Sequence, residues 1–398
     1  MSSRGLTLIL SLTTFVGMTA VLSLRTFLVP MSEEFGVSVA FLAQSVTVAA
    51  LIGGAVALVL GPLSDHYGHR RFMIIGTLFI AAGALLMIVA PSLWVLMLGK
   101  VLAGTGLVGA ITLAFVSFRL PVEDRRPTIG WIASATGGSA LLGIPVMALL
   151  GDLGGWRLAY AALCLVSVVL VAVLMRSLPV DPPIPSQQLR TREVVDSYRT
   201  ILSHVPAVLL YLADTARNIG WQIVLVYLTV YWMTVHDFTL QGVALVALIG
   251  GGSYLVGTRV SVWAVERMGI SRLCWMSTTA MGLTALGMMA LPVSAIPAMA
   301  LMIACGISGG IGYPALTMFI AEASPGKPAA TMALRHAEIT VSIALASAIG
   351  GVLLALGGFP AVAIGVLVIS FGSVGLMFAR ERLDDSPAPV VPVPAPGK

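Results

Sequence analysis

Long apolar runs alternate with short polar loops along the whole chain, and this alternation predicts the architecture. Each run holds around twenty residues with few charges, the length of a helix that crosses about 30 Å of hydrocarbon. A helix satisfies its own main-chain hydrogen bonds, as a chain inside a bilayer must. Twelve spans are predicted, over residues 6–30, 37–61, 72–90, 93–117, 128–150, 157–178, 205–233, 239–263, 272–291, 295–320, 329–354 and 357–379.

Composition excludes the other broad classes. Only 10% of the 398 residues are charged, and the mean hydropathy is +1.01, whereas a soluble domain carries about 25% charged residues. Continuous apolar runs also differ from the alternating pattern of a membrane β-barrel. The three cysteines lie in apolar runs without metal-binding spacing, so neither a disulfide framework nor a metal site is expected. The fold class is therefore predicted to be an all-α polytopic membrane protein.

The loops on the two sides of the predicted membrane differ in charge. One set holds most of the arginines, whereas the other carries acidic residues such as Glu33, Glu34, Asp152 and Asp237. Basic loops stay on the cytoplasmic side, which predicts a multi-pass protein of the cytoplasmic (inner) membrane with both termini in the cytoplasm. The first apolar stretch is too long for the core of a signal peptide and is interpreted as the first span.

A long polar stretch divides the chain into two halves. Its sequence, PVDPPIPSQQLRTREVVDSYRT over 179–200, is rich in proline and arginine, which is typical of a linker. We expect an N-terminal six-helix bundle over 1–178, a cytoplasmic linker over 179–204 and a C-terminal six-helix bundle over 205–380. A disordered proline-rich tail is expected over 381–398.

The two halves resemble each other. At an offset of 201 residues, LSDHYGHRR (63–71) aligns with AVERMGISR (264–272), which pairs Asp65 with Glu266, Gly68 with Gly269 and Arg71 with Arg272. Internally duplicated halves are typical of carriers that alternate access around a central site.

The stretch GPLSDHYGHRR, between the second and third spans, resembles motif A of the major facilitator superfamily. The candidate gating residues are Gly61, Asp65, Gly68, Arg70 and Arg71, and the second-half copy comprises Glu266, Arg267, Gly269 and Arg272. The resemblance covers essentially all twelve spans and implies a twelve-helix carrier of two pseudo-symmetric bundles, not an enzyme. It also implies that Asp65 docks against the other half in the outward-open state, with the motif arginines as counter-charge. His66 and His69 replace commoner arginines, so the charge of this loop is expected to vary with pH.

Two further motifs are similar to those of the same family. GKVLAGTGLVGA carries Lys100 where the family usually has arginine. GGSALLGIPVMALLGDLGGWR resembles the antiporter motif and the Gly-Trp-Arg of proton-coupled drug and metabolite exporters, although Gly143-Ile144-Pro145 replaces the usual Gly-Pro.

Ionisable residues inside the spans indicate where a central site lies, because an unpartnered ion at bilayer depth costs between about 2.5 and more than 10 kcal/mol. Helical spacing puts Tyr211, Asp214, Arg217, Asn218 and Trp221 on one face, and Arg335, Glu338 and Ser342 on another. The candidate proton-coupling residues are Asp214, Glu338 and Arg335. The candidate cavity residues are Arg25, Lys100, Tyr211, Arg217, Asn218 and Trp221.

Simpler roles for these residues stay open. Asp214 and Arg217, three residues apart, could neutralise each other and serve packing only. Arg25 and Arg335 could extend to the nearest membrane surface. The glycine clusters GGGSYLVG (250–257) and GISGGIG (306–312) are expected to bring helices close together.

These observations predict a proton-coupled secondary transporter that exports a small organic compound by alternating access. Its interior is neutral to positive, which suits neutral or anionic substrates. It needs no cofactor, because the proton gradient supplies the energy, and no Walker motif is present. The expected partners are the substrate, protons and the lipid bilayer, with no nucleic acid, and the expected state is a monomer. The alternative is a symporter that imports an organic anion; a membrane enzyme or sensor lacks any supporting motif.

Overall fold

The computed structural model describes residues 3–37, 39–105, 108–180, 191–238, 240–325 and 327–384, and all regular structure in these ranges is helical. The first half of the chain contains α1 (Ser3–Leu22), the 3₁₀ segment η1 (Ser23–Phe27), α2 (Leu28–Phe35), α3 (Val39–Tyr67), α4 (His69–Ile88), α5 (Leu93–Gly104), α6 (Val108–Arg119), α7 (Val122–Gly138), the π segment η2 (Ser139–Gly143) and α8 (Ile144–Ser177). The second half contains α9 (Thr191–Leu202), α10 (Val205–Val235), α11 (Leu240–Met268), α12 (Ile270–Ala290), α13 (Ala295–Ala323) and α14 (Pro328–Asp384).

Nine helical segments of the described chain are long and apolar enough to cross a membrane. Two of them, Val122–Ser177 and Pro328–Leu383, are 56 residues long and each covers two predicted spans. Each is interrupted by a glycine pair with non-helical backbone, Gly154–Gly155 and Gly357–Gly358. Gly155 and Gly358 have φ values of 75° and 64°, a conformation that favours glycine. The breaks lie at the predicted span boundaries, and the all-α polytopic fold is confirmed.

Three predicted boundaries differ from the structure. The first predicted span is not one helix, because α1 ends at Leu22 and the chain continues through η1 into α2. The predicted linker contains the helix α9, and residues 181–190 lie outside the described ranges. Helix α14 continues to Asp384, so the first residues of the predicted tail are helical; the tail from 385 onward is not described.

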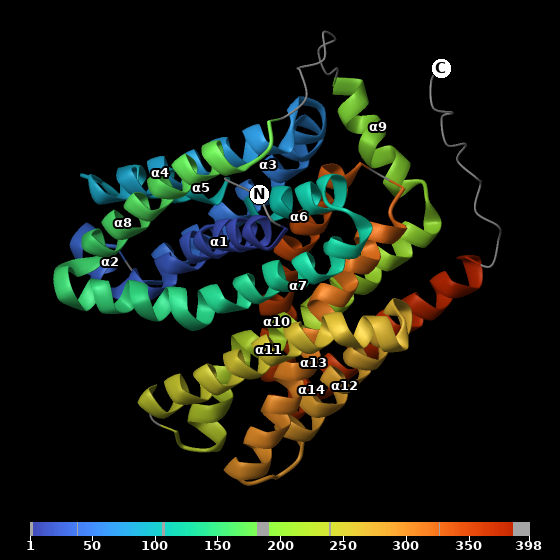
Figure 1. The fold of residues 1–398 in the computed structure, drawn as a ribbon. Coiled ribbons are helices and arrows are strands. Elements are labelled where there is room, and N and C mark those ends of the chain that lie inside the picture. Colours follow the sequence, from blue (N-terminus) through green and yellow to red (C-terminus); the bar gives the residue numbers. More distant parts are fainter. Residues whose placement is uncertain are drawn as a thin grey trace, which may run out of the picture.

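The helices gather in two groups that meet along part of their length. In Figure 1 the first group runs from α1 to α8 and the second from α10 to α14, with α9 at one end of the molecule. We call this end, which also carries the α3–α4 turn, the linker face. Helix α14 packs against α3 and α6, and α11 packs against α7. A hydrophobic core shared by both groups lies along these contacts, and a second core lies within the α10–α14 group.

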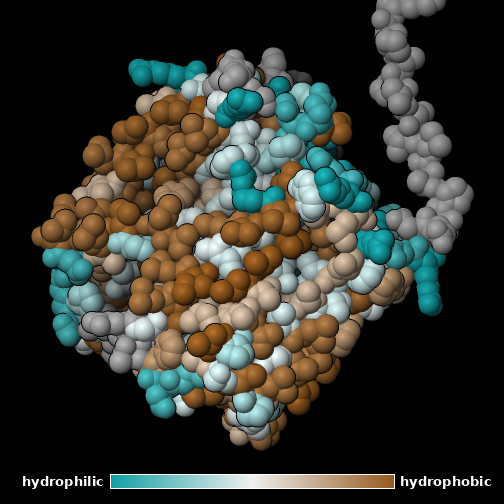
Figure 2. Space-filling model, turned by 60° about the horizontal axis from the view of Figure 1, so that its bottom comes forward, coloured by the Kyte–Doolittle hydropathy of each residue, from teal (hydrophilic) through white to brown (hydrophobic). Residues whose placement is uncertain are grey.

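The outer surface is mostly apolar. Figure 2 shows broad hydrophobic areas over the helices, with hydrophilic residues concentrated towards the margins of the molecule. Exposed leucine and valine side chains occur along α8 and α14, for example Leu165, Val169, Val352 and Val368. Apolar patches this extensive indicate contact with lipid, as in a multi-pass membrane protein.

Glycines bring α11 and α13 into close contact, as the glycine clusters predict. A Cβ atom on Gly257 would lie 2.2 Å from the main-chain oxygen of Ile307, and one on Gly310 would lie 2.1 Å from that of Tyr254. Only glycine allows the two backbones to approach this closely.

We expect Gly257→Val to destabilise the protein and Gly252→Val to leave it nearly unchanged. No atom lies within 4 Å of a Cβ at Gly252, although both glycines belong to the same cluster on α11. Overpacking typically costs about 1–3 kcal/mol, so the thermal midpoint of the purified Gly257→Val protein should fall by several degrees relative to the Gly252→Val control. Equal midpoints would show that the α11–α13 contact is not tight.

Candidate functional site

Asp65, at the end of α3, connects the two halves on the linker face. Its side chain is 4% exposed, and its two carboxylate oxygens accept hydrogen bonds from the main-chain N–H groups of Ala329 (3.1 Å) and Ala330 (3.0 Å). These donors belong to the first turn of α14, where N–H groups have no partner within the helix. The positive end of the helix dipole also attracts the carboxylate. We call this contact the Asp65 latch.

The other motif residues shape the turn around the latch. Gly68 has a φ of 107° and directly precedes α4, and a Cβ on Gly61 would lie 2.5 Å from the Cβ of Ala333. Arg70 donates to the main-chain oxygen of Met175 and Arg71 to that of Tyr67. The His69 ring lies 3.3 Å from the Asp65 carboxylate.

The second-half copy repeats the turn with looser contacts. Gly269 has a φ of 80° and precedes α12, as Gly68 precedes α4. Glu266 and Arg272 are exposed, and the Arg267 guanidinium lies 4.3 Å from the ring centre of Trp263. Arg126 on α7 pairs with Glu322 on α13 at 3.0 Å and interacts electrostatically with Glu266, which adds a second ionic contact between the halves.

A small ion-pair network joins α2 and α8 within the first half. Arg157 and the Trp156 indole, at the end of the Gly-Trp-Arg motif, both donate to the Glu34 carboxylate at 2.9 Å. The hydrogen bond from Arg157 holds the pKa of Glu34 below its ordinary value.

The predicted polar faces of α10 and α14 meet inside the second half. Asp214 is fully buried, and its carboxylate lies 2.9 Å from Nε of Arg335, whose side chain is 3% exposed. Glu338 accepts hydrogen bonds from Thr215 and, at 3.2 Å, from Asn218. The Tyr211 hydroxyl donates to the main-chain oxygen of Thr331 at 2.9 Å. We call this set of contacts the α10–α14 network.

The structure contradicts both simpler interpretations of these charges. The ion-pair partner of Asp214 is Arg335 rather than its helix neighbour Arg217. Because Arg335 is buried against that carboxylate, its side chain does not extend to the membrane surface.

Arg217 and Trp221 point towards α13 rather than into a central cavity. Arg217 donates to Asn218 at 3.2 Å and to the main-chain oxygen of Gly309, and the Trp221 ring stacks on Tyr254 at 5.3 Å. Cβ atoms on Gly312 and Gly309 would lie 2.6 Å from Arg217 Nε and 2.5 Å from the Trp221 ring. These glycines of α13 therefore provide the space for both side chains.

Lys100 contacts the end of α1 rather than the predicted cavity. Its buried ammonium group donates to the main-chain oxygens of Ala20 (2.9 Å) and Val21 (2.7 Å), which lie in the last turn of α1. Carbonyl groups at a helix end lack partners within the helix, so Lys100 caps α1 where the first predicted span breaks. The side chain of Arg25, the remaining predicted cavity residue, lies outside the described part of the structure.

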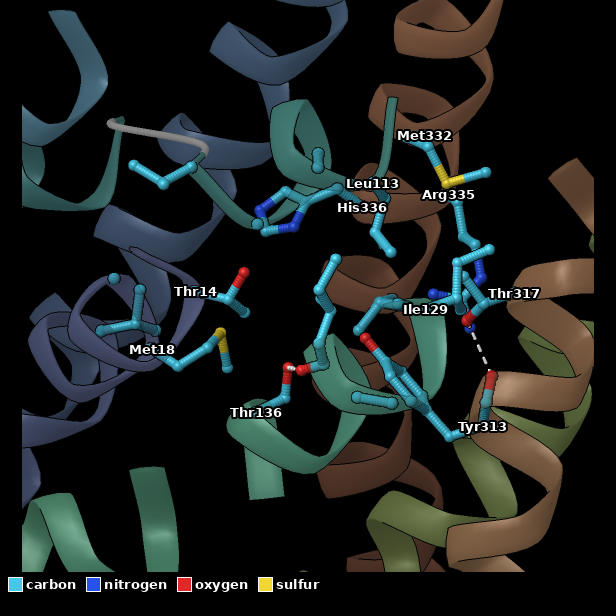
Figure 3. Close-up of a pocket in the computed structure, with 18 of the residues that line it drawn as sticks. Thr14, Met18, Leu113, Ile129, Thr136, Tyr313, Thr317, Met332, Arg335 and His336 are labelled. Carbon is cyan, nitrogen blue, oxygen red and sulfur yellow. Dashed lines mark hydrogen bonds between the residues drawn. The ribbon is translucent and has the colours of Figure 1, made fainter. Parts of the chain in front are cut away.

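A cavity lies between the two halves. It holds about 80 Å³ of space accessible to the centre of a water-sized molecule. It is lined from the first half by α1, α4, α5, α6 and α7 and from the second by α13 and α14. Its polar lining includes Thr14, Thr136, Tyr313, Arg335 and His336 (Figure 3). A mainly apolar lining with a few convergent polar groups is typical of sites for small organic molecules, although the cavity in this state is smaller than such sites usually are.

Arg335 is the predicted residue that lines this cavity. Its guanidinium carbon lies 4.7 Å from the ring centre of Tyr313, so the side chain belongs both to the cavity and to the α10–α14 network. Sequence reasoning missed Tyr313 and His336, although His336 is adjacent to Arg335 and Tyr313 precedes the proline of α13. Figure 3 shows the His336 ring directed away from Arg335, towards the first half.

The chain belongs to the major facilitator superfamily, whose family model matches residues 10–334. Members of this family are membrane transporters of small molecules rather than enzymes. The purine ribonucleoside efflux pump NepI of Salmonella paratyphi A is 25% identical over 242 residues, which are 60% of this chain and 59% of the relative. The chain thus spans less than two thirds of the length of the curated relatives it matches.

Solved structures show the same fold. The human organic anion transporter MFSD10 aligns with a TM-score of 0.80, 14% identity, and coverage of 95% of this chain and 100% of the other. The fucose:proton symporter FucP of E. coli aligns with a TM-score of 0.77, 13% identity, and coverage of 96% and 99%.

We expect Asp214→Asn and Arg335→Gln each to destabilise the protein. The double variant should lose less stability than the sum of the two single losses. Removing one partner of a buried pair typically costs about 3–5 kcal/mol in soluble proteins, because the other charge is left unpaired. Thermal midpoints of both single variants and the double variant, measured in detergent, give the coupling between the sites. Additive midpoint shifts would contradict the ion pair.

Proposed function

We propose that this protein is a proton-coupled exporter of a small organic compound, of the drug and metabolite antiporter type, working by alternating access. One observation carries the proposal: Arg335 lines the cavity between the halves and is also the ion-pair partner of buried Asp214. Binding of substrate in the cavity and binding of a proton to Asp214 or Glu338 would then both depend on Arg335. Competition between substrate and protons is what an exchanger of the two requires.

The Asp65 latch provides the gate in this proposal. Its two donors, Ala329 and Ala330, lie on the same helix as Arg335 and Glu338, less than three turns away. A change of charge around Arg335 would shift α14 and weaken the latch, which allows the linker face to open. The described structure, with the latch formed, represents the state closed on this face.

Orientation and energy source complete the proposal. The charge of the basic loops supports an orientation with the linker face and both termini in the cytoplasm of a cell with an inner membrane. The protein would act as a monomer. It would need no cofactor, because each charge that moves across the membrane yields about 2.3 kcal/mol per 100 mV. The efflux pump named among its relatives makes purine ribonucleosides the first compounds to test.

The alternative function is a symporter that imports an organic anion. Arg335 and His336 both line the cavity, and no Asp or Glu occurs among the described lining residues. An anionic group could therefore bind beside Arg335.

Proteoliposomes with a pH gradient should distinguish the two directions of coupling. An exporter that exchanges substrate for protons should accumulate labelled adenosine or guanosine when the lumen is acid. A symporter should accumulate labelled benzenesulfonate when the exterior is acid; this anion stays ionised, so it does not cross the bilayer as a neutral acid. These outcomes do not depend on how the protein is oriented in the vesicles, and accumulation that ignores the pH gradient would contradict both functions.

In the same assay, Glu338→Gln should abolish accumulation driven by the pH gradient and retain exchange of labelled for unlabelled substrate, because an amide cannot carry the proton. Glu123→Gln is the control, since Glu123 is exposed in the first turn of α7. Wild-type accumulation by Glu338→Gln would remove Glu338 from the proton pathway.

Asp65→Asn should insert normally and transport about tenfold or more slowly, because hydrogen bonds to a charged group contribute roughly 1.5–3 kcal/mol each. Initial rates at equal amounts of protein in the membrane provide the measurement. Asp152→Asn, at an exposed acidic position, serves as the matched control. An unchanged rate in Asp65→Asn would rule out the Asp65 latch as a gate.

A further inference from the structure

Proline at position 62 leaves one main-chain carbonyl of α3 without its usual donor. Within a helix the oxygen of Leu58 would accept from the N–H of residue 62, and that residue is Pro62, which has no N–H. A buried carbonyl without a donor is costly. Pro62 lies in the same turn as Gly61 and one turn before Asp65, so the vacant position is next to the latch.

The hydroxyl of Tyr198, on α9, fills this vacancy by donating to the oxygen of Leu58. Tyr198 is partly buried and packs against the core shared by the two halves. Burial first, and then the nearby charge of Asp65, raises the pKa of Tyr198 above its ordinary value. The hydroxyl therefore keeps its proton and remains a donor.

Helix α9 is fixed to the second half, so this hydrogen bond crosses between the halves. Only Ser203 and His204 separate α9 from α10; the N–H of Ser203 donates to Arg199 at 2.8 Å, and the His204 ring accepts from Ala207 at 3.3 Å. Ile201 of α9 is fully buried, and α9 contacts α10 and α14 as well as α3. The helix should move with α10 as one body.

We propose that Tyr198 is a gate-positioning residue: its hydroxyl fastens α9 to the carbonyl that Pro62 leaves vacant, and thereby holds the linker face closed beside Asp65. The proposal rests on alternating access, as proposed above, and adds a contact from the segment that joins the halves. When the linker face opens, the carbonyl of Leu58 must lose this donor. Pro62 and Tyr198 thus set part of the free-energy difference between the closed and open states.

The test measures the opening of the linker face directly. Spin labels are placed at Arg176→Cys on α8 and Arg382→Cys on α14, both exposed at this face, in a Cys164→Ser background that removes the partly exposed native thiol. Distance distributions from double electron–electron resonance then report the populations of closed and open states in the full-length protein. We expect Tyr198→Phe to raise the open-to-closed ratio by about five- to tenfold, the effect of losing one hydrogen bond to a buried acceptor.

Two further variants separate this role from general damage. Tyr227→Phe also removes a hydroxyl that donates to a main-chain carbonyl, that of Ser347 at 2.9 Å, but both residues belong to the second half, so the ratio should not change. Pro62→Ala restores an N–H that can pair with Leu58. In that background Tyr198→Phe should change the ratio by less than about twofold, because the carbonyl no longer depends on the hydroxyl.

Equal ratios for Tyr198→Phe and Tyr227→Phe would overturn the proposal, as would an undiminished effect of Tyr198→Phe in Pro62→Ala. The Asp65→Asn variant separates failure of the role of Tyr198 from failure of alternating access. If Asp65→Asn opens the linker face and Tyr198→Phe does not, only the role of Tyr198 fails. If neither variant changes the distances, both the role of Tyr198 and alternating access at this face are contradicted.

Discussion

A charge inside a bilayer must have a partner, and this constraint determines how the second half of the protein is built. Asp214 and Arg335 are both buried and lie on different helices, so α10 and α14 must stay in contact while both residues are charged. Desolvation at this depth costs several kcal/mol per ion, and only close pairing offsets it. Glu338 adds an acceptor that Thr215 and Asn218 hold in place. The packing of α10 on α14 therefore depends on the charges between them, and a change in protonation acts directly on it.

Helix α14 carries this dependence to the boundary between the halves. Its first turn supplies the N–H groups that bind Asp65, and its next turns carry Arg335 and His336 into the cavity. A helix transmits displacement along its axis because its main-chain hydrogen bonds are continuous. The cavity, the buried ion pair and the latch are thus three contacts of one rigid element, which is the arrangement that coupling between distant sites requires.

Periodicity predicts which faces of α10 and α14 are polar, because helical spacing depends on the residues alone. It does not predict which charges pair, since that depends on the rotation and separation of two helices. Asp214 has Arg217 three residues away, yet its ion-pair partner is Arg335. Arg217 instead points towards α13, where Gly309 and Gly312 leave room for side chains of α10. Lys100 was predicted to line the cavity because it lies deep in its span at the position of the family's arginine. Its role follows from the break at the end of α1, which the hydropathy of the predicted span over 6–30 does not reveal. Two polar residues of the cavity, Tyr313 and His336, were missed because neither belongs to a polar face that the spacing predicts; His336 is rotated about 100° from Arg335 on α14.

The two copies of the motif have diverged in how their acidic residues are held. Asp65 is buried and binds two main-chain donors of α14, whereas Glu266 is exposed and interacts with Arg126 through charge. A buried carboxylate bound to N–H groups depends on precise geometry, so it distinguishes sharply between docked and separated halves. An exposed ionic contact is screened by solvent and tolerates displacement. In the proposed alternating access, the first contact would define the closed state, and the second would let the same surfaces slide during the transition. Gly68 and Gly269, which precede α4 and α12, both have positive φ and preserve the turn geometry. The acidic residue of each copy differs in its contacts.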